Sequence, residues 1–224
     1  MIIEPIAYIE TDFKEKFGIP RQSNRVDTVG RIVFLPKYRD PEALRGIEDF
    51  SHLWLIFDFS LAHREGFSPT VRPPRLGGNT RVGVFATRSP FRPNSIGLSS
   101  VRLIKVEQNE QDGSYLVVSG ADLLDKTPIY DIKPYLPHSD CHPDAIGGFS
   151  DAVSSYSLKV ICPDGLLAPL PEEKRASLLA CLAEDPRPSY QNDPDRVYHM
   201  HFSDFDISFS VNGDTLTVLC VLPF

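Results

Sequence analysis

The loop from Ala86 to Ser100, ATRSPFRPNSIGLSS, carries side chains that suit recognition of an anion. It holds Arg88 and Arg92 without any acidic residue, and Pro90 and Pro93 restrict its backbone. A guanidinium is a planar fork that binds a carboxylate or phosphate at two points, and a stiff loop loses less entropy when a ligand binds. The segment therefore indicates a site for an anionic or carboxylate-bearing ligand. The alternative is a proline-rich turn with its arginines in water.

The distribution of charge bears on the same question. The chain has 224 residues and a formal net charge of −7, which by itself argues against a nucleic-acid partner. Between Ser60 and Lys105, however, eight Lys or Arg residues stand against one acid, Glu65, so this segment is +7 and the remainder −14. A cationic face on an acidic protein can bind phosphates, because counterion release depends on the contacting surface. The alternative is that these arginines pair with acids elsewhere in the fold.

Cysteine content and hydropathy narrow the class of protein. The four cysteines are scattered without a C-x-x-C pair, which favours reduced thiols over a disulfide framework. No apolar run approaches the roughly 18 residues of a membrane-spanning helix, and the N-terminal segment lacks the pattern of a secretory signal. We therefore expect a cytoplasmic protein with no membrane partner.

Apolar and β-branched runs bounded by Gly, Pro, Asn or Asp predict strands in the first 120 residues. Loops, not regularly alternating helices, join these runs, which favours a closed or nearly closed barrel over a doubly wound parallel sheet. One short helix is predicted over 41–50, with Asp40 as its N-cap and Pro41 as its first residue. The predicted strands are 2–10, 30–36, 52–60, 81–88, 96–106 and 114–120.

The composition becomes acidic after about residue 140. Leucines at helical spacing predict a helix over 171–185. Alternating runs over 197–211 and 215–222 flank Asn212-Gly213, and this pattern is typical of a hairpin. The predicted fold is therefore mainly β, with a β-barrel domain at 1–148 and a small α+β C-terminal domain at 149–224.

Common catalytic motifs are absent from the sequence. No G-x-G-x-x-G follows a predicted strand, and no P-loop, H-E-x-x-H or G-x-S-x-G occurs. The run HSDCH, from His138 to His142, matches no standard zinc spacing, so no metal site is expected. His199 and His201 share one face of a predicted strand, where packing of the hairpin explains them. The residues alone thus predict a barrel, a small C-terminal domain and a stiff cationic loop, but they do not indicate which reaction the protein catalyses.

The stretch GVFATRSPFRPNSIGLS at 83–99 closely resembles the signature of the TsaA-like, or TrmO, family of tRNA methyltransferases. Other runs resemble the same family, in the same order along the chain. They are FKEKFGIPRQ, LRGIEDFSHLWLIFDF, DLLDKTPIYDIKPYLP and DPRPSY. Together these motifs span most of residues 1–140 and part of the C-terminal segment.

The resemblance implies a function. Members of the family use S-adenosylmethionine bound on a β-barrel, and they methylate N6 of N6-threonylcarbamoyladenosine at position 37 of tRNA, just 3′ of the anticodon. The resemblance also implies a homodimer with the methyl donor near the subunit interface. Two other functions stay open: a methyltransferase of the same fold with another acceptor, because a fold and a donor site do not fix the acceptor, and a non-catalytic S-adenosylmethionine-binding RNA module.

Matching positions in this sequence acquire expected roles toward the donor. Arg88 would contact its carboxylate or ribose, and Arg21, Gln22 and Ser23 would supply polar groups for its hydroxyls and adenine edge. Asp125 offers a carboxylate for the ammonium or the diol. The remaining expected donor contacts are Phe59, Ser60, Leu98, Lys126, Thr127 and Pro128.

Some of these assignments have an alternative. Phe59 and Leu98 could be ordinary core residues. Ser60 stands where some relatives carry His, and His63 follows three residues later. The residue at position 60 therefore departs from the family pattern, and a function of the histidine side chain in those relatives does not carry over to Ser60.

Other residues are expected to serve the acceptor. Asp131 is the candidate for accepting the departing N6 proton, and the alternative is an ion pair with Lys133 or a nearby arginine. Arg92 could contact the substrate or brace its own loop against Asp122 or Asp131. Arginines and aromatic rings bind the backbone and unstacked loop bases of RNA. The expected tRNA contacts are Arg72, Arg75, Arg92, Lys133 and Tyr135.

Overall fold

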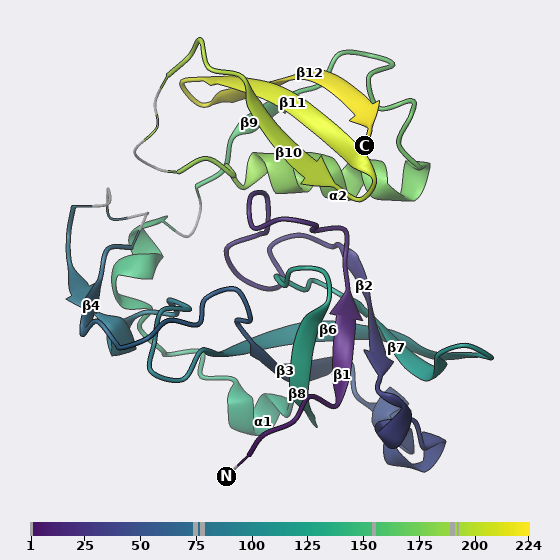
Figure 1. Cartoon of the computed structure of the whole chain (residues 1–224). Coiled ribbons are helices and arrows are strands. Elements are labelled where there is room, and N and C mark those ends of the chain that lie inside the picture. Colours follow the sequence, from purple (N-terminus) through teal and green to yellow (C-terminus); the bar gives the residue numbers. More distant parts are fainter. Residues whose placement is uncertain (1, 74–75, 77–78, 154–155, 189–190, 192) are drawn as a thin grey trace.

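The computed structural model describes residues 2–224 apart from 74–75, 77–78, 154–155, 189–190 and 192. Figure 1 shows two groups of strands, one built from the first half of the chain and one from the C-terminal part, with helix α2 facing the first group. The predicted mainly β fold is confirmed. In this part of the chain, no helix has the length and hydropathy needed to cross a membrane.

Six strands of the first group pair in a closed ring. The order is β1-β2-β7-β6-β3-β8, and β8 pairs with β1 to close the barrel. All of these pairings are antiparallel. The strands are β1 (Ala7–Glu10), β2 (Val29–Phe34), β3 (His52–Asp58), β6 (Ile96–Asn109), β7 (Gly113–Ser119) and β8 (Thr127–Pro134).

Alternation of side chains fills the interior of this barrel. In β3, Leu53, Leu55 and Phe57 are buried while the residues between them are partly exposed. Successive side chains in a strand point to opposite faces, so every second residue reaches the interior. Ile9, Ile32, Leu116 and others complete the core. Full burial of each such side chain contributes about 1.5–3 kcal/mol.

The second group is a four-stranded sheet with one helix. Its order is β10-β11-β12-β9, and only the β12–β9 pair is parallel. Helix α2 (Glu172–Ala183) buries Leu178, Cys181 and Leu182, and Glu172 and Glu173 favour its N-terminus through the helix dipole. The strands are β9 (Lys159–Ile161), β10 (Tyr198–Phe202), β11 (Phe205–Asn212) and β12 (Thr215–Pro223).

The predicted C-terminal helix and hairpin are confirmed, with a small shift of the turn. Asn212 still pairs with Thr215, so Gly213 and Asp214 form the turn, and Gly213 has a φ of +60°. The four cysteines are unpaired, as expected of reduced thiols.

Two local predictions in the first half are wrong. The region predicted as a helix over 41–50 contains two short 3-10 turns, η2 (Pro41–Leu44) and η3 (Ile47–Asp49), because Gly46 between them has a φ of +82°. The cap itself is confirmed, since the Asp40 side chain accepts a hydrogen bond from the Glu42 backbone N–H.

The strand predicted over 81–88 is also largely absent. Only β5 (Val82–Gly83) is extended there, and it pairs with β4 (Thr70–Val71) in a hairpin outside the barrel. Short helical segments complete the described secondary structure. They are η1 (Pro36–Tyr38), η5 (Val84–Ala86), α1 (Pro137–Asp140) and η6 (Gly148–Val153).

Residues 11–28, which connect β1 to β2, join the two groups. Phe13 and Val26 are buried in the hydrophobic core of the C-terminal sheet, and Phe17 and Ile19 pack against it. Lys174 of α2 adds a polar tie, because its Nζ lies 2.6 Å from Asp12 Oδ1 and 2.7 Å from Ser203 Oγ. The second core therefore draws on both halves of the chain and fixes the path of this connection.

Candidate functional site

A pocket of about 710 Å³ opens on the barrel, within the usual size range of small-molecule sites of roughly 300–1,000 Å³. Four segments distant in sequence form its walls. They are residues 19–22 of the β1–β2 connection, 57–62 at and after the end of β3, 87–99 leading into β6, and 122–127 before β8. The stiff cationic loop noted in the sequence is thus one wall of this pocket.

Hydrogen bonds within that loop hold its shape. Thr87 Oγ1 donates to the carbonyl of Val84 at 2.8 Å and accepts from the backbone N–H of Ser89 at 3.2 Å. Arg92 Nη1 donates to the carbonyl of Thr87 at 3.1 Å. Arg92 therefore braces its own loop through the backbone, not through Asp122 or Asp131, while its side chain still lines the pocket.

Arg88 connects two walls of the pocket. Its Nη1 donates to Gln22 Oε1 at 2.5 Å, and Gln22 Nε2 donates to the carbonyl of Arg21. The residues described by the structure give Arg88 no carboxylate partner, and its side chain is exposed. Its guanidinium is therefore available to an anionic group in the pocket.

Two carboxylates line the same pocket. Asp58, at the end of β3, is buried and lies 2.7 Å from His63 Nε2, and burial together with Asp58 raises the pKa of Tyr130. Asp122 accepts a 2.6 Å hydrogen bond from Ser99 Oγ. Burial raises the pKa of Asp122, although the Ser99 hydroxyl and the charge of Arg88 act to lower it. Asp122 makes no ion pair with a described cation, although Arg88 is near enough to act on its charge, so this carboxylate would gain from a cationic ligand.

Aromatic side chains supply the apolar part of the site. Phe57 and Phe59 meet edge to face with ring centroids 5.0 Å apart, and both line the pocket. Gly97 lies opposite Phe57 in the β3–β6 pairing, and a Cβ at this position would overlap the Phe57 ring. Glycine at 97 therefore lets the ring occupy its place in the wall.

The structure brings eight of the predicted site residues together. They line the pocket: Arg21, Gln22, Phe59, Ser60, Arg88, Arg92, Leu98 and Thr127. Leu98 is 54% exposed, so it is not an ordinary core residue. Ser23 is not part of the lining, but its backbone contacts the Asp122 carboxylate.

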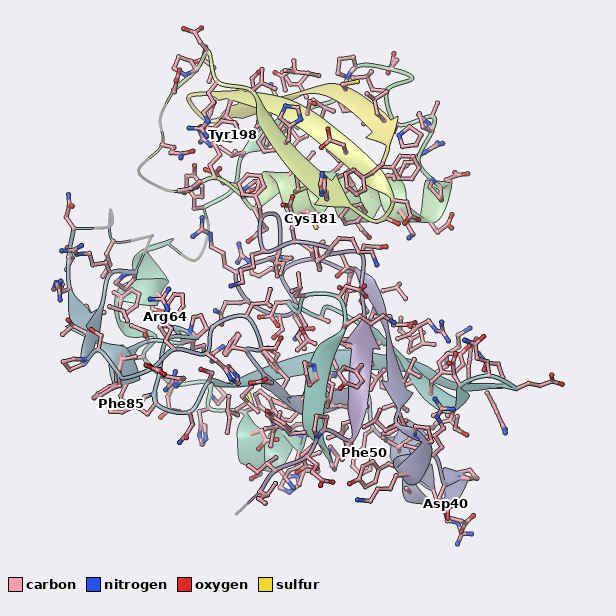
Figure 2. All side chains as sticks on the ribbon, in the orientation of Figure 1. Asp40, Phe50, Arg64, Phe85, Cys181 and Tyr198 are labelled. Atoms are coloured by element: carbon pink, nitrogen blue, oxygen red, sulfur yellow. The ribbon has the colours of Figure 1, made fainter. Side chains whose placement is uncertain are left out.

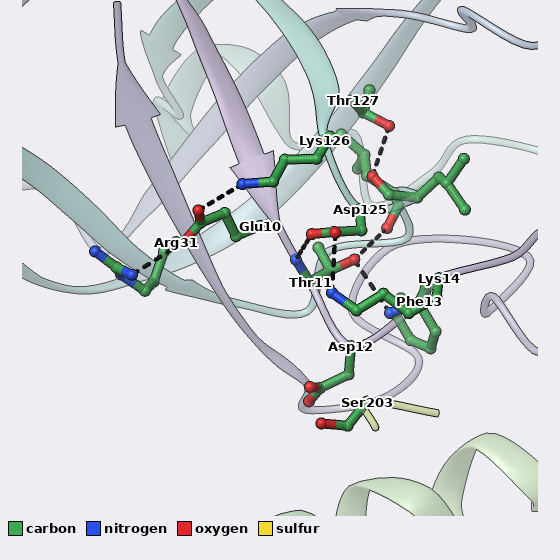
Figure 3. A network of polar contacts seen from close by, with 12 residues as sticks. Glu10, Thr11, Asp12, Phe13, Lys14, Arg31, Asp125, Lys126, Thr127 and Ser203 are labelled. Atoms are coloured by element: carbon green, nitrogen blue, oxygen red, sulfur yellow. Dashed lines mark hydrogen bonds and ion pairs between the residues drawn. The ribbon is translucent and has the colours of Figure 1, made fainter. Parts of the chain in front are cut away.

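Asp125 and Lys126 lie beside a second, smaller cavity and are engaged in a network of polar contacts (Figure 3). Asp125 accepts hydrogen bonds from the Thr11 backbone N–H and from Lys14 Nζ, each at 2.9 Å. Lys126 Nζ lies 2.7 Å from Glu10 Oε1. These pairs tie the start of β8 to the end of β1, while the neighbouring Thr127 reaches the main pocket and Pro128 does not.

Asp131, Lys133 and Tyr135 also lie outside the lining of the main pocket. Asp131 Oδ2 is 2.9 Å from Lys133 Nζ, which is the ion pair considered as the alternative. Tyr135 packs against Trp54 with centroids 5.5 Å apart. Arg72 follows β4 and is exposed, whereas Arg75 lies outside the described residues.

The cationic segment is mostly free of acidic partners. Among the described residues, Arg102 pairs with Asp27 at 3.5 Å and Lys105 pairs with Glu107. The other described cations of the segment make no ion pair with a carboxylate. These are Arg64, Arg72, Arg81, Arg88 and Arg92. The alternative was that these arginines pair with acidic residues elsewhere in the fold, and among the described residues these five arginines do not.

Some pocket residues were missed by sequence reasoning, above all Asp58 and Asp122. Asp58 interrupts the apolar run HLWLIF, and a carboxylate ending a buried strand is a usable indication of function. Asp122 comes from the same motif as Asp125, but nothing in their spacing tells which one faces the pocket.

The histidines singled out in the sequence make other contacts in the structure. No group of three or more potential ligands gathers among the residues that the structure describes. In HSDCH, Asp140 instead accepts hydrogen bonds from Trp54 Nε1 and the Leu136 backbone, each at 2.9 Å. His199 and His201 both lie near Asp206 across the β10–β11 pair, which confirms their role in the hairpin.

The C-terminal unit holds one wall of the pocket. Arg21 Nη2 donates to the carbonyls of Asp185 and Arg187, at 3.4 and 3.0 Å. Asp185 and Arg187 form a buried ion pair at 2.9 Å, and Tyr156 donates to Asp185 at 2.8 Å. Asp185 and Arg187 belong to the DPRPSY motif, whose last two residues lie outside the described part of the chain.

Comparison with known proteins identifies relatives along the whole chain. Residues 8–141 match the model of the tRNA-methyltransferase O N-terminal domain, and residues 168–224 match that of the TrmO C-terminal domain. A tRNA (adenine(37)-N6)-methyltransferase of Escherichia coli K12 is 39% identical over 229 residues, covering 98% of this chain and 97% of the relative. A predicted S-adenosylmethionine-dependent methyltransferase of Pseudomonas aeruginosa is 42% identical over 222 residues, covering 92% and 90%. A crystal structure of TrmO from Pseudomonas aeruginosa superposes with a TM-score of 0.81 at 36% identity, covering 100% of this chain and 97% of that one.

Proposed function

The chain belongs to the tRNA-methyltransferase O family, and we propose that its barrel pocket binds S-adenosylmethionine beside N6 of threonylcarbamoyladenosine 37 of tRNA. It is a tRNA (adenine(37)-N6)-methyltransferase, and S-adenosylmethionine supplies the methyl group as an electrophile on a sulfonium. The observation that carries the site assignment is the pocket in which Arg88 and Asp122, neither of them in an ion pair among the described residues, meet two aromatic rings.

The residues of this pocket fit the chemistry of the donor. Its methionine part carries a carboxylate and an ammonium, and Arg88 and Asp122 present the complementary charges. Phe57 and Phe59 offer an apolar wall for the adenine, and Gln22 offers an amide for polar edges. Asp122 takes the role first considered for Asp125, because Asp125 is held by Lys14 and Thr11.

Positioning is the main contribution that these walls make to the reaction. The N6 lone pair is delocalised into the purine and is a weak nucleophile, so alignment of the acceptor with the donor supplies much of the rate, up to roughly 7–11 kcal/mol in ideal cases. Asp131 is paired with Lys133 and lies outside the pocket lining. The proposed mechanism therefore assigns it no proton transfer: the N6–CH3 bond forms as the methyl–sulfur bond breaks to leave S-adenosylhomocysteine, and the N6 proton leaves to water.

Changes to the pocket charges test the donor assignment. Arg88→Ala should weaken binding of S-adenosylmethionine by about 10- to 150-fold, because a hydrogen bond to a charged group contributes about 1.5–3 kcal/mol. Asp122→Asn should weaken it as well. Calorimetry without tRNA measures both effects, and 5′-methylthioadenosine, which lacks the amino-acid part, is the control ligand. Both variants should bind this control like the unchanged protein, and equal affinity of Arg88→Ala for S-adenosylmethionine would remove Arg88 from the site.

Salt dependence tests the role of the cationic segment in tRNA binding. Replacing Arg72 and Arg81 with Gln should reduce the slope of log K against log salt by about 0.9 per lost phosphate contact. Arg102→Gln is the matched control from the same segment, because Arg102 already pairs with Asp27. An unchanged slope in the Arg72 and Arg81 variants would show that these side chains do not face phosphates.

We further propose an organisation for the working enzyme. Residues 1–148 carry the donor site, and residues 149–224 form a C-terminal domain that holds the Arg21 wall. The enzyme acts in the cytoplasm as a homodimer. Leu61 and Leu98 line the pocket and are 62% and 54% exposed, and contact with a second copy would remove their apolar surface from water. Sedimentation of the purified chain measures the association state.

A further inference from the structure

Two phenylalanines beside the pocket are exposed in a way that folding does not explain. Phe85 is 72% exposed and Phe67 is 53% exposed, and their rings stack with centroids 6.2 Å apart at an interplanar angle of 26°. Burial of a Phe side chain contributes about 1.5–3 kcal/mol to folding, and this pair forgoes most of that gain. The stacked pair is therefore a surface feature that points to a ligand.

The backbone conformation around Phe85 and Phe67 directs the two rings to the surface. Val84 is buried, and its N–H donates to the carbonyl of Pro69 at 2.9 Å, so the neighbouring Phe85 in η5 is directed outward. Gly66 has a φ of +76°, a conformation that side chains rarely allow, and this turn precedes Phe67. Phe85 is thus held by the short η5 segment, and Phe67 follows the left-handed turn at Gly66 in the connection between β3 and β4.

Arginines without an ion pair among the described residues occur in the same part of the chain as the two rings. Arg64 lies over the ring of Phe91, which lines the pocket, at 3.7 Å from the guanidinium carbon to the ring centroid. Arg81, beside β5, donates to Thr70 Oγ1 at 3.0 Å and makes no ion pair with a described carboxylate. Figure 2 shows Arg64 and Phe85 on the same side of the molecule, near the β4–β5 hairpin. Exposed aromatic rings and cations therefore share one face next to the pocket.

We propose that Phe67 and Phe85 form a stacking platform for an unpaired base of the tRNA anticodon loop, with Arg64, Arg72 and Arg81 as contacts to its backbone. Base–aromatic stacking tolerates any base, since every base has a π face, and cationic grooves with aromatic rings are the usual means of binding single-stranded nucleic acid. The inference rests on the proposed function, because that function places nucleotide 37 in the adjoining pocket and its unpaired neighbours outside it.

A second copy of the chain is a poorer occupant of this face. A two-fold contact brings the same patch of both copies together, so the unpaired arginines of one copy would face those of the other. Like charges across an interface oppose association. A polyanion with flat, unpaired bases complements both the charge and the rings.

Substitution of the rings tests the platform. Phe85→Ala should weaken binding of a tRNA anticodon stem-loop by about 5- to 150-fold, which corresponds to the 1–3 kcal/mol per stacked base found by alanine substitution. The slope of log K against log salt should stay unchanged, because the ring carries no charge. Phe224→Ala, an equally drastic change at a residue that is 81% exposed in the C-terminal unit, is the matched control and should leave the affinity within about twofold.

A fluorescent base reports stacking directly. Stem-loops with 2-aminopurine at one unpaired loop position at a time should include one whose fluorescence falls on binding, and Phe85→Ala should abolish that fall. Unchanged affinity and unchanged quenching in Phe85→Ala would overturn the platform, and so would a change in association state that accounts for the lost affinity. If the unchanged protein binds S-adenosylmethionine and methylates tRNA while Phe85→Ala does so equally well, only this inference fails. If the unchanged protein transfers no methyl group, the proposed function itself fails.

Discussion

A tRNA carrying threonylcarbamoyladenosine at position 37 is expected to be methylated about 10⁴-fold faster than an unmodified transcript of the same sequence. Sites built around polar groups reject analogues that lack them by about this factor, because the groups of the site are left desolvated and unpaired. Four cationic side chains line the pocket, Lys16, Arg21, Arg88 and Arg92, against the carboxylates of Asp58 and Asp122. The donor brings one carboxylate, one ammonium and one sulfonium, so positive charge stays in excess and suits a second anion such as the threonyl carboxylate.

The modification also changes the acceptor nitrogen. Conjugation with the carbamoyl carbonyl makes the N6 proton easier to remove, so both effects favour the modified tRNA. The assay is transfer of labelled methyl groups to the two tRNAs at matched concentration, with donor binding measured separately. Comparable rates on both would contradict the assignment of the acceptor and leave the donor site standing.

Arg187→Ala is expected to lower the free energy of unfolding of the C-terminal unit by about 3–5 kcal/mol, because it leaves Asp185 charged and buried without its partner. The side chains of Arg187 and Asp185 are 7% and 11% exposed and lie 2.9 Å apart. Arg25→Ala is the control, since it breaks a pair with Glu184 whose arginine is 33% exposed, and more accessible pairs are usually worth under about 1 kcal/mol.

Urea unfolding followed by fluorescence and by circular dichroism measures both changes. The loss in Arg187→Ala should also weaken donor binding, since the Asp185 and Arg187 carbonyls hold Arg21 in the pocket wall. A stability equal to that of the Arg25→Ala protein would show that the buried pair does not hold the C-terminal unit together.

Secondary-structure elements that depend on nearby residues were predictable from the sequence. The helix at α2 follows from the spacing of its leucines, and the hairpin of β11 and β12 follows from the turn residues between two alternating runs. The cap at Asp40 was also predictable, but the helix after it was not, because Gly46 adopts a left-handed conformation that breaks it into two turns. Residues 81–88 resemble a strand in composition, yet they pair only briefly with β4 outside the barrel.

The site was partly predictable for a related reason. The family motifs led to Arg88, Gln22 and Phe59, which the fold brings to one pocket from three distant segments. Asp122 was not predicted, because its role depends on which of two carboxylates in one motif is already paired. That choice is made by Lys14 and Thr11, more than 100 residues earlier in the chain. The spacing of residues within one motif cannot reveal pairing with residues so far away in the sequence.

The central claim is that this chain transfers a methyl group from S-adenosylmethionine to N6 of the modified adenosine 37. The most direct measurement incubates the purified protein with methyl-labelled S-adenosylmethionine and tRNA from a strain that lacks this activity, followed by digestion and mass spectrometry of the nucleosides. We expect the label on threonylcarbamoyladenosine as its N6-methyl derivative, and we expect Arg88→Ala to reduce it greatly. Label on another atom or nucleoside, or no transfer by a protein that binds S-adenosylmethionine normally, would show that this chain does not methylate N6 of the modified adenosine 37.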